Sequence, residues 1–292
     1  MNIIGHTKIL KLLDKAITKN SVSHAYLFYG PDQVGKFTVA LDFANKLLGD
    51  SSQINPDLII VKPEIEEKKG VSKKHDIKIE EIRELQHKLS LSSQSGKHKI
   101  AIIDESDRLN KIAQNALLKS LEEAKAGVVL ILVSSDEKKI LPTMISRCQK
   151  VRFGAVPEKE MREELKSESK EKTEEIIFWS LGRPGLMMEL KSNEEEFDSR
   201  GEIKKELTDL FGKNISERFL LAEAMAKDGE LLEKKLNLWL ILLREAILGT
   251  GKFKLGPGKA LSLAGHIEKD LEILKNTNSN AKLVLENLFL QF

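Results

Sequence analysis

Short apolar runs bounded by turn residues recur along the first half of the chain and predict buried strands. The predicted strands are Ala25–Tyr29, Leu58–Val61, Ile100–Ile103 and Val128–Val133. Between them, apolar residues at helical spacing predict helices, which cover Ile3–Ala16, Lys36–Leu48, Ile79–Leu91 and Ala113–Glu123. Strands that alternate with helices in this way favour an α/β fold with a parallel, doubly wound sheet covered on both faces.

Two other stretches have a different pattern. The segment Lys62–Lys78 is rich in lysine and glutamate, which is typical of a solvated hairpin or loop. After Gly154–Pro157 the composition changes, and only helical patterns follow. A short helical region to about Leu190 is interrupted at Gly182–Gly185 and is followed by an acidic patch, Glu194–Glu196. The helical tail has apolar spacing in Phe219–Met225, Leu231–Leu248 and Leu261–Phe292, with a turn predicted at 249–258.

Composition places the chain among charge-rich globular proteins. Of its 292 residues, 41% are hydrophobic and 32% are charged, and 47 basic side chains nearly cancel 45 acidic ones. A net charge of +2 does not by itself indicate a nucleic-acid-binding protein, so any basic patch has to be local. The amino terminus lacks a signal-peptide pattern and no apolar run is long enough to span a bilayer. The single cysteine, Cys148, excludes an internal disulfide and a multi-cysteine zinc site, and we expect a cytoplasmic protein with no membrane association.

The first predicted strand leads into a loop that is typical of a phosphate-binding site. Gly30 and Gly35 bracket this loop, and Lys36 opens the following helix. Backbone N–H groups at a helix N-terminus favour an anion, and the lysine adds a point charge for the outer phosphates, as in a Walker A motif. The motif requires Ser or Thr after the lysine as a magnesium ligand, but this chain has Phe37. Thr38 comes one residue late, which turns its side chain by roughly 100° on a helix. We therefore expect phosphate binding through Gly30, Gly35, Lys36 and Thr38, without efficient metal-dependent hydrolysis.

An acidic pair, Asp104 and Glu105, follows the third predicted strand and matches a Walker B pattern. In such a pair the aspartate holds magnesium and the glutamate polarises the attacking water. Two acidic residues at a strand end also occur without such a role, but the preceding phosphate loop favours the nucleotide interpretation. Ser134 and Ser135 end the next strand, where they either orient a γ-phosphate or cap the strand.

The tripeptide Ser146-Arg147-Cys148 follows a turn that begins at Leu141-Pro142. An arginine displayed on such a turn can reach the nucleotide of a neighbouring subunit and stabilise charge on a transferring phosphoryl group. Taken alone, the same tripeptide is more typical of a surface arginine in an ion pair.

Several motifs together give the chain a family resemblance. They are His24–Phe28, the loop Gly30–Lys36, Asp104–Asp107, Asn115–Glu123 and Leu141–Cys148. In this combination they resemble the bacterial DNA polymerase III clamp-loader subunits of the AAA+ class, most closely the delta-prime type. The matches cover roughly residues 1–155, and Ser180–Gly185 resembles the lid motif of the family.

The resemblance implies an AAA+ RecA-like αβα domain over residues 1–155, a helical lid over 156–200 and an all-α collar over 201–292 that joins a pentameric ring. It also implies that Arg147 acts in trans as an arginine finger. The chain departs from the family pattern in three ways. Phe37 replaces the magnesium hydroxyl, Gly185 stands where ATPase members carry a sensor arginine, with Arg183 displaced, and residues 48–58 lack the cysteines that bind zinc in many relatives.

We therefore predict a delta-prime-type clamp-loader subunit with no independent ATPase activity, in which bound ATP is structural or the site is vestigial, and which holds no zinc. The implied partners are gamma/tau and delta subunits, the sliding clamp and primer–template DNA, the last contacted through its phosphates. One alternative is an active gamma/tau-like ATPase motor or another AAA+ ATPase, which the intact Asp104-Glu105 pair favours. Another is a binding module whose tail serves only assembly.

Overall fold

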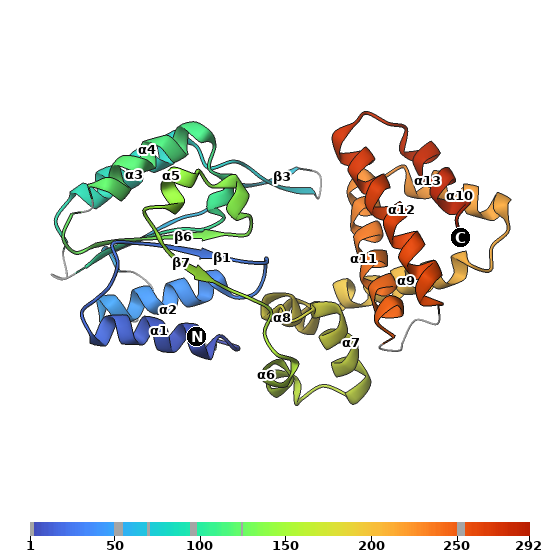
Figure 1. The fold of residues 1–292 in the computed structure, drawn as a ribbon, viewed down its shortest axis with the longest axis horizontal. Coiled ribbons are helices and arrows are strands. Elements are labelled where there is room, and N and C mark those ends of the chain that lie inside the picture. The colour runs from blue at the N-terminus through green and yellow to red at the C-terminus, as the bar shows by residue number, and fades with distance from the viewer. Residues whose placement is uncertain (1–2, 50–54, 69–70, 94–97, 124, 250–254) are drawn as a thin grey trace. The chain divides into compact units, whose positions relative to one another are not determined.

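The computed structural model describes residues 3–49, 55–68, 71–93, 98–123, 125–249 and 255–292 (Figure 1). Contacts divide the chain into two compact units, Met1–Glu189 and Leu190–Phe292. The predicted domain boundaries after residues 155 and 200 stay predictions. Among the described helices, none has both the length and the apolarity needed to cross a membrane.

The first unit is built on a five-stranded parallel sheet in the order β2-β5-β6-β1-β7. Its strands are β1 (Ala25–Tyr29), β2 (Leu58–Val61), β5 (Lys99–Ile103), β6 (Val128–Ser134) and β7 (Gln149–Arg152). The four strands predicted from apolar runs are all present, so the α/β prediction is confirmed. A fifth strand, β7, was not predicted, because only Val151 of its four residues is buried and no apolar run marks it.

Helices cover both faces of this sheet (Figure 1). One face is covered by α1 (Thr7–Thr18) and α2 (Lys36–Leu48). The other is covered by α3 (Ile79–Ser90), α4 (Lys111–Glu122) and the short α5 (Pro142–Ile145). The predicted first helix begins at Thr7 rather than at Ile3, because Gly5 and His6 adopt left-handed backbone conformations with φ of 79° and 58°.

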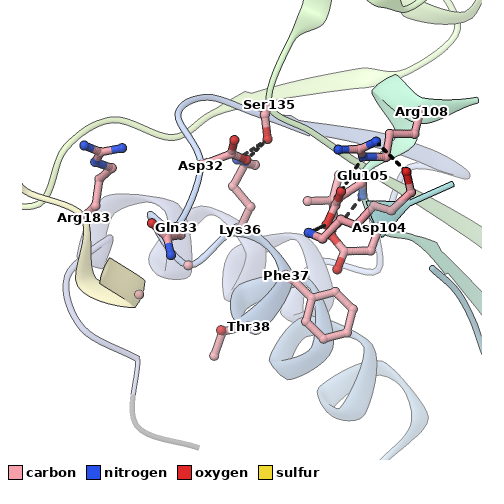
Figure 2. Close-up of a pocket in the computed structure, with 14 residues that line it drawn as sticks. Asp32, Gln33, Lys36, Phe37, Thr38, Asp104, Glu105, Arg108, Ser135 and Arg183 are labelled. Carbon is pink, nitrogen blue, oxygen red and sulfur yellow. Dashed lines mark hydrogen bonds and ion pairs between the residues drawn. The ribbon is translucent and has the colours of Figure 1, made fainter. Parts of the chain in front are cut away.

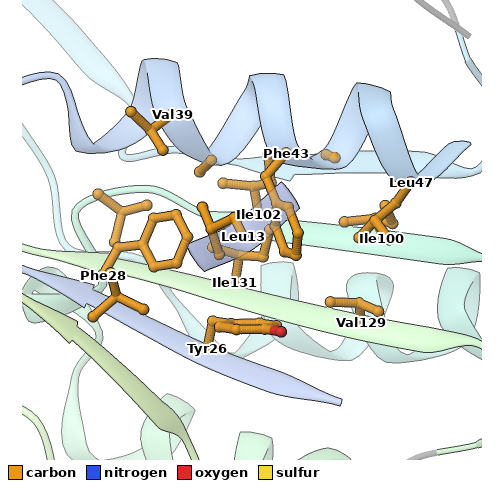
Figure 3. Close-up of a cluster of buried hydrophobic side chains, with 14 of the residues drawn as sticks. Leu13, Tyr26, Phe28, Val39, Phe43, Leu47, Ile100, Ile102, Val129 and Ile131 are labelled. Atoms are coloured by element: carbon orange, nitrogen blue, oxygen red, sulfur yellow. The ribbon is translucent and has the colours of Figure 1, made fainter. Parts of the chain in front are cut away.

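Alternation along β1 creates two separate cores. Tyr26 and Phe28 point toward α1 and α2 and pack with Phe43 (Figure 3), whereas Ala25 and Leu27 belong to the cluster on the α3 and α4 side. Successive side chains of a strand point to opposite faces, so a strand buried on both faces is apolar throughout. These two cores fix the carboxyl ends of β1, β5 and β6, where the predicted phosphate loop and acidic pair lie.

The predicted solvated hairpin between β2 and α3 is present. It consists of β3 (Ile65–Lys68) and β4 (Val71–Lys74), which pair antiparallel with Ile65 opposite Lys74. Two 3-10 turns, η1 (Ser106–Arg108) and η2 (Glu137–Lys139), follow β5 and β6. After β7, the chain continues with α6 (Glu158–Arg162), η3 (Glu163–Leu165), α7 (Lys170–Ser180) and α8 (Pro184–Ser192), and the boundary between the two units falls within α8. The predicted interruption between α7 and α8 is confirmed: Leu181 and Gly182 have φ of 51° and 73° there.

The second unit contains helices and no strand among its described residues. Its helices are α9 (Glu194–Leu210), α10 (Ile215–Met225), α11 (Gly229–Leu248), α12 (Pro257–Asn276) and α13 (Ala281–Phe289). The acidic patch Glu194–Glu196 forms the first turn of α9, where carboxylates interact favourably with the helix dipole. The expectation of one continuous helical pattern over Leu261–Phe292 was wrong, because Asn280 caps a new helix by accepting the Lys282 N–H at 3.0 Å. The predicted turn at 249–258 lies partly outside the described residues; Gly249 ends α11 and Gly256 precedes α12.

An aromatic cluster forms the centre of the second unit. The Trp239 ring lies 6.0 Å from that of Phe289 and 6.1 Å from that of Phe292, measured between ring centroids. Trp239 is fully buried, and its indole N–H donates to the Ile203 carbonyl at 3.3 Å. Together, the hydrogen bond and the ring contacts of Trp239 join α9, α11 and the carboxyl-terminal segment.

Candidate nucleotide-binding site

A cavity of about 560 Å³ lies at the carboxyl ends of the central strands, between the phosphate loop and the acidic pair (Figure 2). Its walls come from the loop, from the start of α2, from the ends of β4, β5 and β6, and from the start of α8. The lining residues are Asp32, Gln33, Gly35, Lys36, Phe37, Thr38, Lys74, Asp104, Glu105, Arg108, Val133, Ser135, Arg183 and Gly185. The cavity therefore brings together five of the six predicted nucleotide-binding residues, Gly35, Lys36, Thr38, Asp104 and Glu105.

The sixth, Gly30, shapes the loop from behind the cavity. It adopts φ of 144°, and a Cβ at this position would lie 2.2 Å from the Phe153 carbonyl oxygen, so no other residue fits. Gly35 has φ of 97° and precedes α2 directly, while Gln33 between them has φ of 60°. The first N–H groups of a helix lack intrahelical acceptors, so this conformation provides donors for a phosphate group.

Lys36 folds back across the loop that precedes it. Its ammonium group donates to the carbonyl oxygens of Gly30 at 2.8 Å and Pro31 at 2.6 Å, and lies 3.5 Å from the Ser135 Oγ. Burial lowers the pKa of Lys36, and nearby carboxylates, first among them Asp32, oppose this effect. Through these hydrogen bonds Lys36 connects the end of the phosphate loop to its beginning.

The two serines after β6 have different surroundings. Ser134 is fully buried, and its hydroxyl donates to the Asp107 carboxylate at 3.1 Å, which is a structural contact. Ser135 faces the cavity, and its hydroxyl donates to the Asp32 carboxylate (Figure 2). This bond connects the end of β6 to the phosphate loop.

The acidic pair is held by cations of the same chain. Burial raises the pKa of Asp104, and the positive charge of Lys62 opposes that rise. Both carboxylate oxygens of Glu105 are engaged: one pairs with the Lys74 ammonium group, and the other accepts the Arg108 Nε–H at 2.8 Å. Sequence reasoning missed Lys62, Lys74 and Arg108. Arg108 follows Glu105 by three residues on a 3-10 turn, a spacing that could have been noticed, whereas Lys74 reaches the site only through the hairpin.

The residues fit phosphate groups but do not fit magnesium. Phe37 occupies the position of the metal-binding hydroxyl, and the Lys62 ammonium group lies 3.8 Å from the centre of its ring. Thr38 points away from Asp104 and Glu105 (Figure 2) and also lines a neighbouring cavity of about 250 Å³. Magnesium requires several oxygen ligands in near-octahedral geometry, so an aromatic ring and an ammonium group beside Asp104 oppose it.

The start of α8 closes the cavity on the opposite side. The Gly185 N–H donates to the Gln33 carbonyl at 2.7 Å, and the Gln33 side chain donates to the Glu189 carboxylate at 2.7 Å. A Cβ on Gly185 would lie 2.8 Å from the same Gln33 oxygen, so an arginine does not fit here in this arrangement. Arg183, two residues before Gly185, lines the cavity.

Arg147 lies outside the walls of this cavity, just after α5. Its guanidinium group pairs with Glu122 of α4 at 2.5 Å and donates to the Thr143 carbonyl at 2.8 Å. Its side chain is 35% exposed. The next residue, Cys148, packs against the α3 and α4 core, and burial raises the pKa of its thiol to about 12.

This sheet order, with a phosphate loop after β1 and an acidic pair after β5, defines a protein of the AAA+ class. The structure is similar to that of a DNA polymerase III gamma subunit-related protein of Thermotoga maritima, with a TM-score of 0.56 and 20% identity. That likeness covers 97% of this chain and 96% of the other, and it shows the fold.

The chain belongs to the DNA polymerase III delta-subunit family and is of the delta-prime type. The family model described as "DNA polymerase III, delta subunit" matches residues 5–157, just over half of the chain. The chain is 29% identical over 215 residues to the DNA polymerase III subunit delta' of Bacillus subtilis, which covers 68% of this chain and 63% of that protein. It is 32% identical over 183 residues to the delta' subunit of Pseudomonas aeruginosa, covering 56% of this chain and 54% of that protein. The matched part thus spans less than two thirds of either relative, and it confirms the resemblance seen in the sequence.

Proposed function

We propose that this chain is a delta-prime-type subunit of a clamp loader that helps to load a sliding clamp on primed DNA during replication. It would join a ring with gamma/tau-type and delta-type subunits, and its second, helical unit would serve as the collar of that ring. Within the ring, Arg147 would act in trans on the nucleotide of a neighbouring ATPase subunit. The names of the relatives support the clamp-loader role, since they include delta' and tau subunits of DNA polymerase III.

The observation that carries this proposal is a contrast between two sites on the chain. Its own acidic pair is engaged internally, because Lys74 and Arg108 take both oxygens of Glu105. Arg147, by contrast, is presented outside the chain's own cavity, half-exposed and held at a fixed position by Glu122 and Thr143. A glutamate paired with two cations is poorly placed to polarise water, whereas Arg147 is paired with a single, 48% exposed carboxylate that a partner's phosphates would replace.

The cavity of this chain would keep its phosphate loop without turning ATP over. Lys36 and the loop glycines support binding, and Phe37 counts against a metal-dependent reaction. Bound ATP would then be structural, and we expect neither a catalytic magnesium nor a zinc ion. Contacts with DNA would be made to its phosphates, which are the same for every sequence.

A second candidate function is that of an ATPase motor, and the presence of Lys36, Asp104 and Glu105 around one cavity favours it. The two functions predict different behaviour of the isolated chain. Robust magnesium-dependent ATP turnover by the purified protein would support the motor and contradict the proposal. Absence of turnover, together with stimulation of a partner's ATPase activity, would support the proposal.

The test of the proposal is the ATPase rate of a ring reconstituted with the tau and delta subunits of the same organism. Arg147→Ala should lower that rate by about 10³-fold or more, the size of effect expected for an arginine finger. Arg147→Lys should also lower it, because lysine keeps the charge but loses the planar fork. Arg152→Ala, on the exposed side of β7, is the matched control.

Folding and assembly have to be separated from catalysis in this test. The Arg147–Glu122 pair is half-exposed, so its loss should cost less than about 1 kcal/mol of folding free energy. Gel filtration should therefore show an intact ring with Arg147→Ala. An intact ring with an unchanged ATPase rate would overturn the arginine-finger role and leave the assembly-only alternative.

A further inference from the structure

The register of β2 and β5 places a lysine directly beside the first residue of the acidic pair. Val61 is paired with Ile103, and the Asp104 N–H donates to the Val61 carbonyl at 2.9 Å. The next residues, Lys62 and Asp104, therefore lie side by side on the same face of the sheet, because parallel partners share a face. Val61 and Ile103 contact the α3 and α4 core, so Lys62 and Asp104 belong to the α2 side.

Phe37 is the residue of α2 that meets this pair. The Lys62 ammonium group lies 3.8 Å from the centre of the Phe37 ring, a cation–π distance. An aromatic face thus holds a side-chain cation beside Asp104, at the helix position where an ATPase carries its metal-binding hydroxyl. The phenylalanine that replaces this hydroxyl is thus also the residue that holds Lys62 beside Asp104.

The second acidic residue has cations of its own. Lys74 and Arg108 take both carboxylate oxygens of Glu105, and Arg108 also donates to the Lys74 carbonyl at 3.4 Å. Each carboxylate that would act on a magnesium ion is therefore accompanied by at least one positive side chain. A divalent cation entering here would meet like charge, and like charges at close range are mutually destabilising.

The rest of the cavity is suited to an anion. Four basic side chains and three acidic ones are among the described residues of its walls, and Lys62 adds a further positive charge next to them. The remaining acidic residue, Asp32, accepts a hydrogen bond from Ser135. Lys36 and Arg183 line the cavity on the side of the phosphate loop, opposite the acidic pair.

We propose that this cavity binds a nucleoside polyphosphate as the free anion, without magnesium, because Lys62, Lys74 and Arg108 neutralise the two carboxylates that would otherwise hold the metal. The inference rests on the nucleotide site of the proposed function and specifies the charged form of its ligand. It also explains why an intact acidic pair coexists with a missing metal hydroxyl.

The test is calorimetric titration of the full-length protein with ATP, once in excess EDTA and once in excess magnesium. ATP should bind in EDTA and bind at least about tenfold more weakly in magnesium, the size of effect that one nearby charge has on another in a protein. Lys62→Gln should remove this preference for the free anion, while Lys36→Ala should abolish binding under both conditions. Lys166→Gln, at a 73% exposed lysine on the surface of the same unit, should behave like the unmodified protein.

A thermal-shift measurement gives an independent readout. ATP with EDTA should raise the melting temperature of the unmodified protein, and excess magnesium should reduce the rise. The melting temperature without ATP shows whether Lys62→Gln is folded; if it is not, Lys74→Gln takes its place. Tighter binding in magnesium, or no binding in EDTA, overturns the inference. Neither result bears on the ring assay of Arg147, so a failure here is distinguishable from a failure of the clamp-loader proposal.

Discussion

Gly185 and Gln33 are in direct backbone contact, with the Gly185 N–H donating to the Gln33 carbonyl at 2.7 Å. The contact joins the first turn of α8 to the middle of the phosphate loop. There is no space for a side chain at this point, because a Cβ on Gly185 would lie 2.8 Å from the Gln33 oxygen. Glycine at position 185 is therefore required by the packing of the phosphate loop.

Gly185→Ala should destabilise the first unit even though alanine is the better helix former. The added Cβ forces backbone to move, which costs about 1–3 kcal/mol for overpacked sites. Urea unfolding followed by the fluorescence of Trp179, in a Trp239→Phe background, measures the change in the free energy of unfolding. Gly154→Ala is the matched control, since no atom lies within 4 Å of its added Cβ. If Gly185→Ala is instead more stable, the backbone around Gln33 accommodates the added Cβ and the prediction is wrong.

Glu105→Gln should leave the ATPase rate of the reconstituted ring unchanged. In this chain the carboxylate pairs with Lys74 and Arg108 and does not act on water. The partly exposed ion pairs should contribute no more than about 1 kcal/mol to stability, so the variant should fold normally. The measurement is steady-state ATP hydrolysis beside Arg147→Ala. A loss of about 10²-fold or more, as expected for removal of a general base, would instead identify this chain as a motor.

Cys148 should react slowly with thiol reagents in the folded protein. Burial raises the pKa of its thiol to about 12 from an ordinary value of 9.0, so the reactive thiolate is scarce at pH 8. Alkylation with iodoacetamide, measured before and after addition of denaturant, should be markedly slower in the folded state, because the raised pKa leaves less thiolate. Equal rates in the two states would contradict the burial of this thiol.

The same residue makes stability depend on pH in the alkaline range. Its folded pKa lies above the unfolded one, so its contribution is fully present below about pH 9. As pH rises from 9 toward 12, the unfolded chain loses its proton first and unfolding becomes easier. Cys148→Ala should reduce this loss of stability between those pH values, measured by urea unfolding.

Trp239→Ala should strongly destabilise the second unit. It removes the ring that contacts Phe289 and Phe292 and leaves a cavity, which for Trp→Ala costs about 3–5 kcal/mol. Leu283→Ala is the control, because that side chain is 62% exposed and its loss should change stability by less than about 0.5 kcal/mol. Circular dichroism during urea unfolding measures both. Equal effects would mean that the aromatic cluster does not form the core of this unit.

The sequence predicts the fold well where burial on both faces leaves an apolar signature. β1, β5 and β6 contain continuous apolar runs because helices cover both sides of the sheet. The edge strand β2 is also apolar, although none of its residues is fully buried and Ile60 is 41% exposed. The missed strand, β7, has one neighbour and only one buried side chain, so its pattern resembles that of a loop. The break before α13 was missed because Asn280 is a capping signal that lies within a stretch of otherwise helical spacing.

The site was predictable only where its residues are neighbours in the chain. Lys36 and the Asp104-Glu105 pair follow their strands directly and were found. The cations Lys62 and Lys74 reach that pair through strand register and through a hairpin that, by composition, is merely solvated. Pairing across strands is a property of the folded sheet, so no local pattern could show which lysines of a charged segment face the site.

The position of β7 at the edge of the sheet bears on whether another molecule can add a strand there. β7 pairs with β1 on one side only, and three of its four residues, Gln149, Lys150 and Arg152, are exposed. Lys150 is fixed there by Glu137 at 2.6 Å. Polar and charged side chains on an outer strand discourage the addition of a further strand from another molecule. This border of the sheet is thus protected against edge-to-edge aggregation.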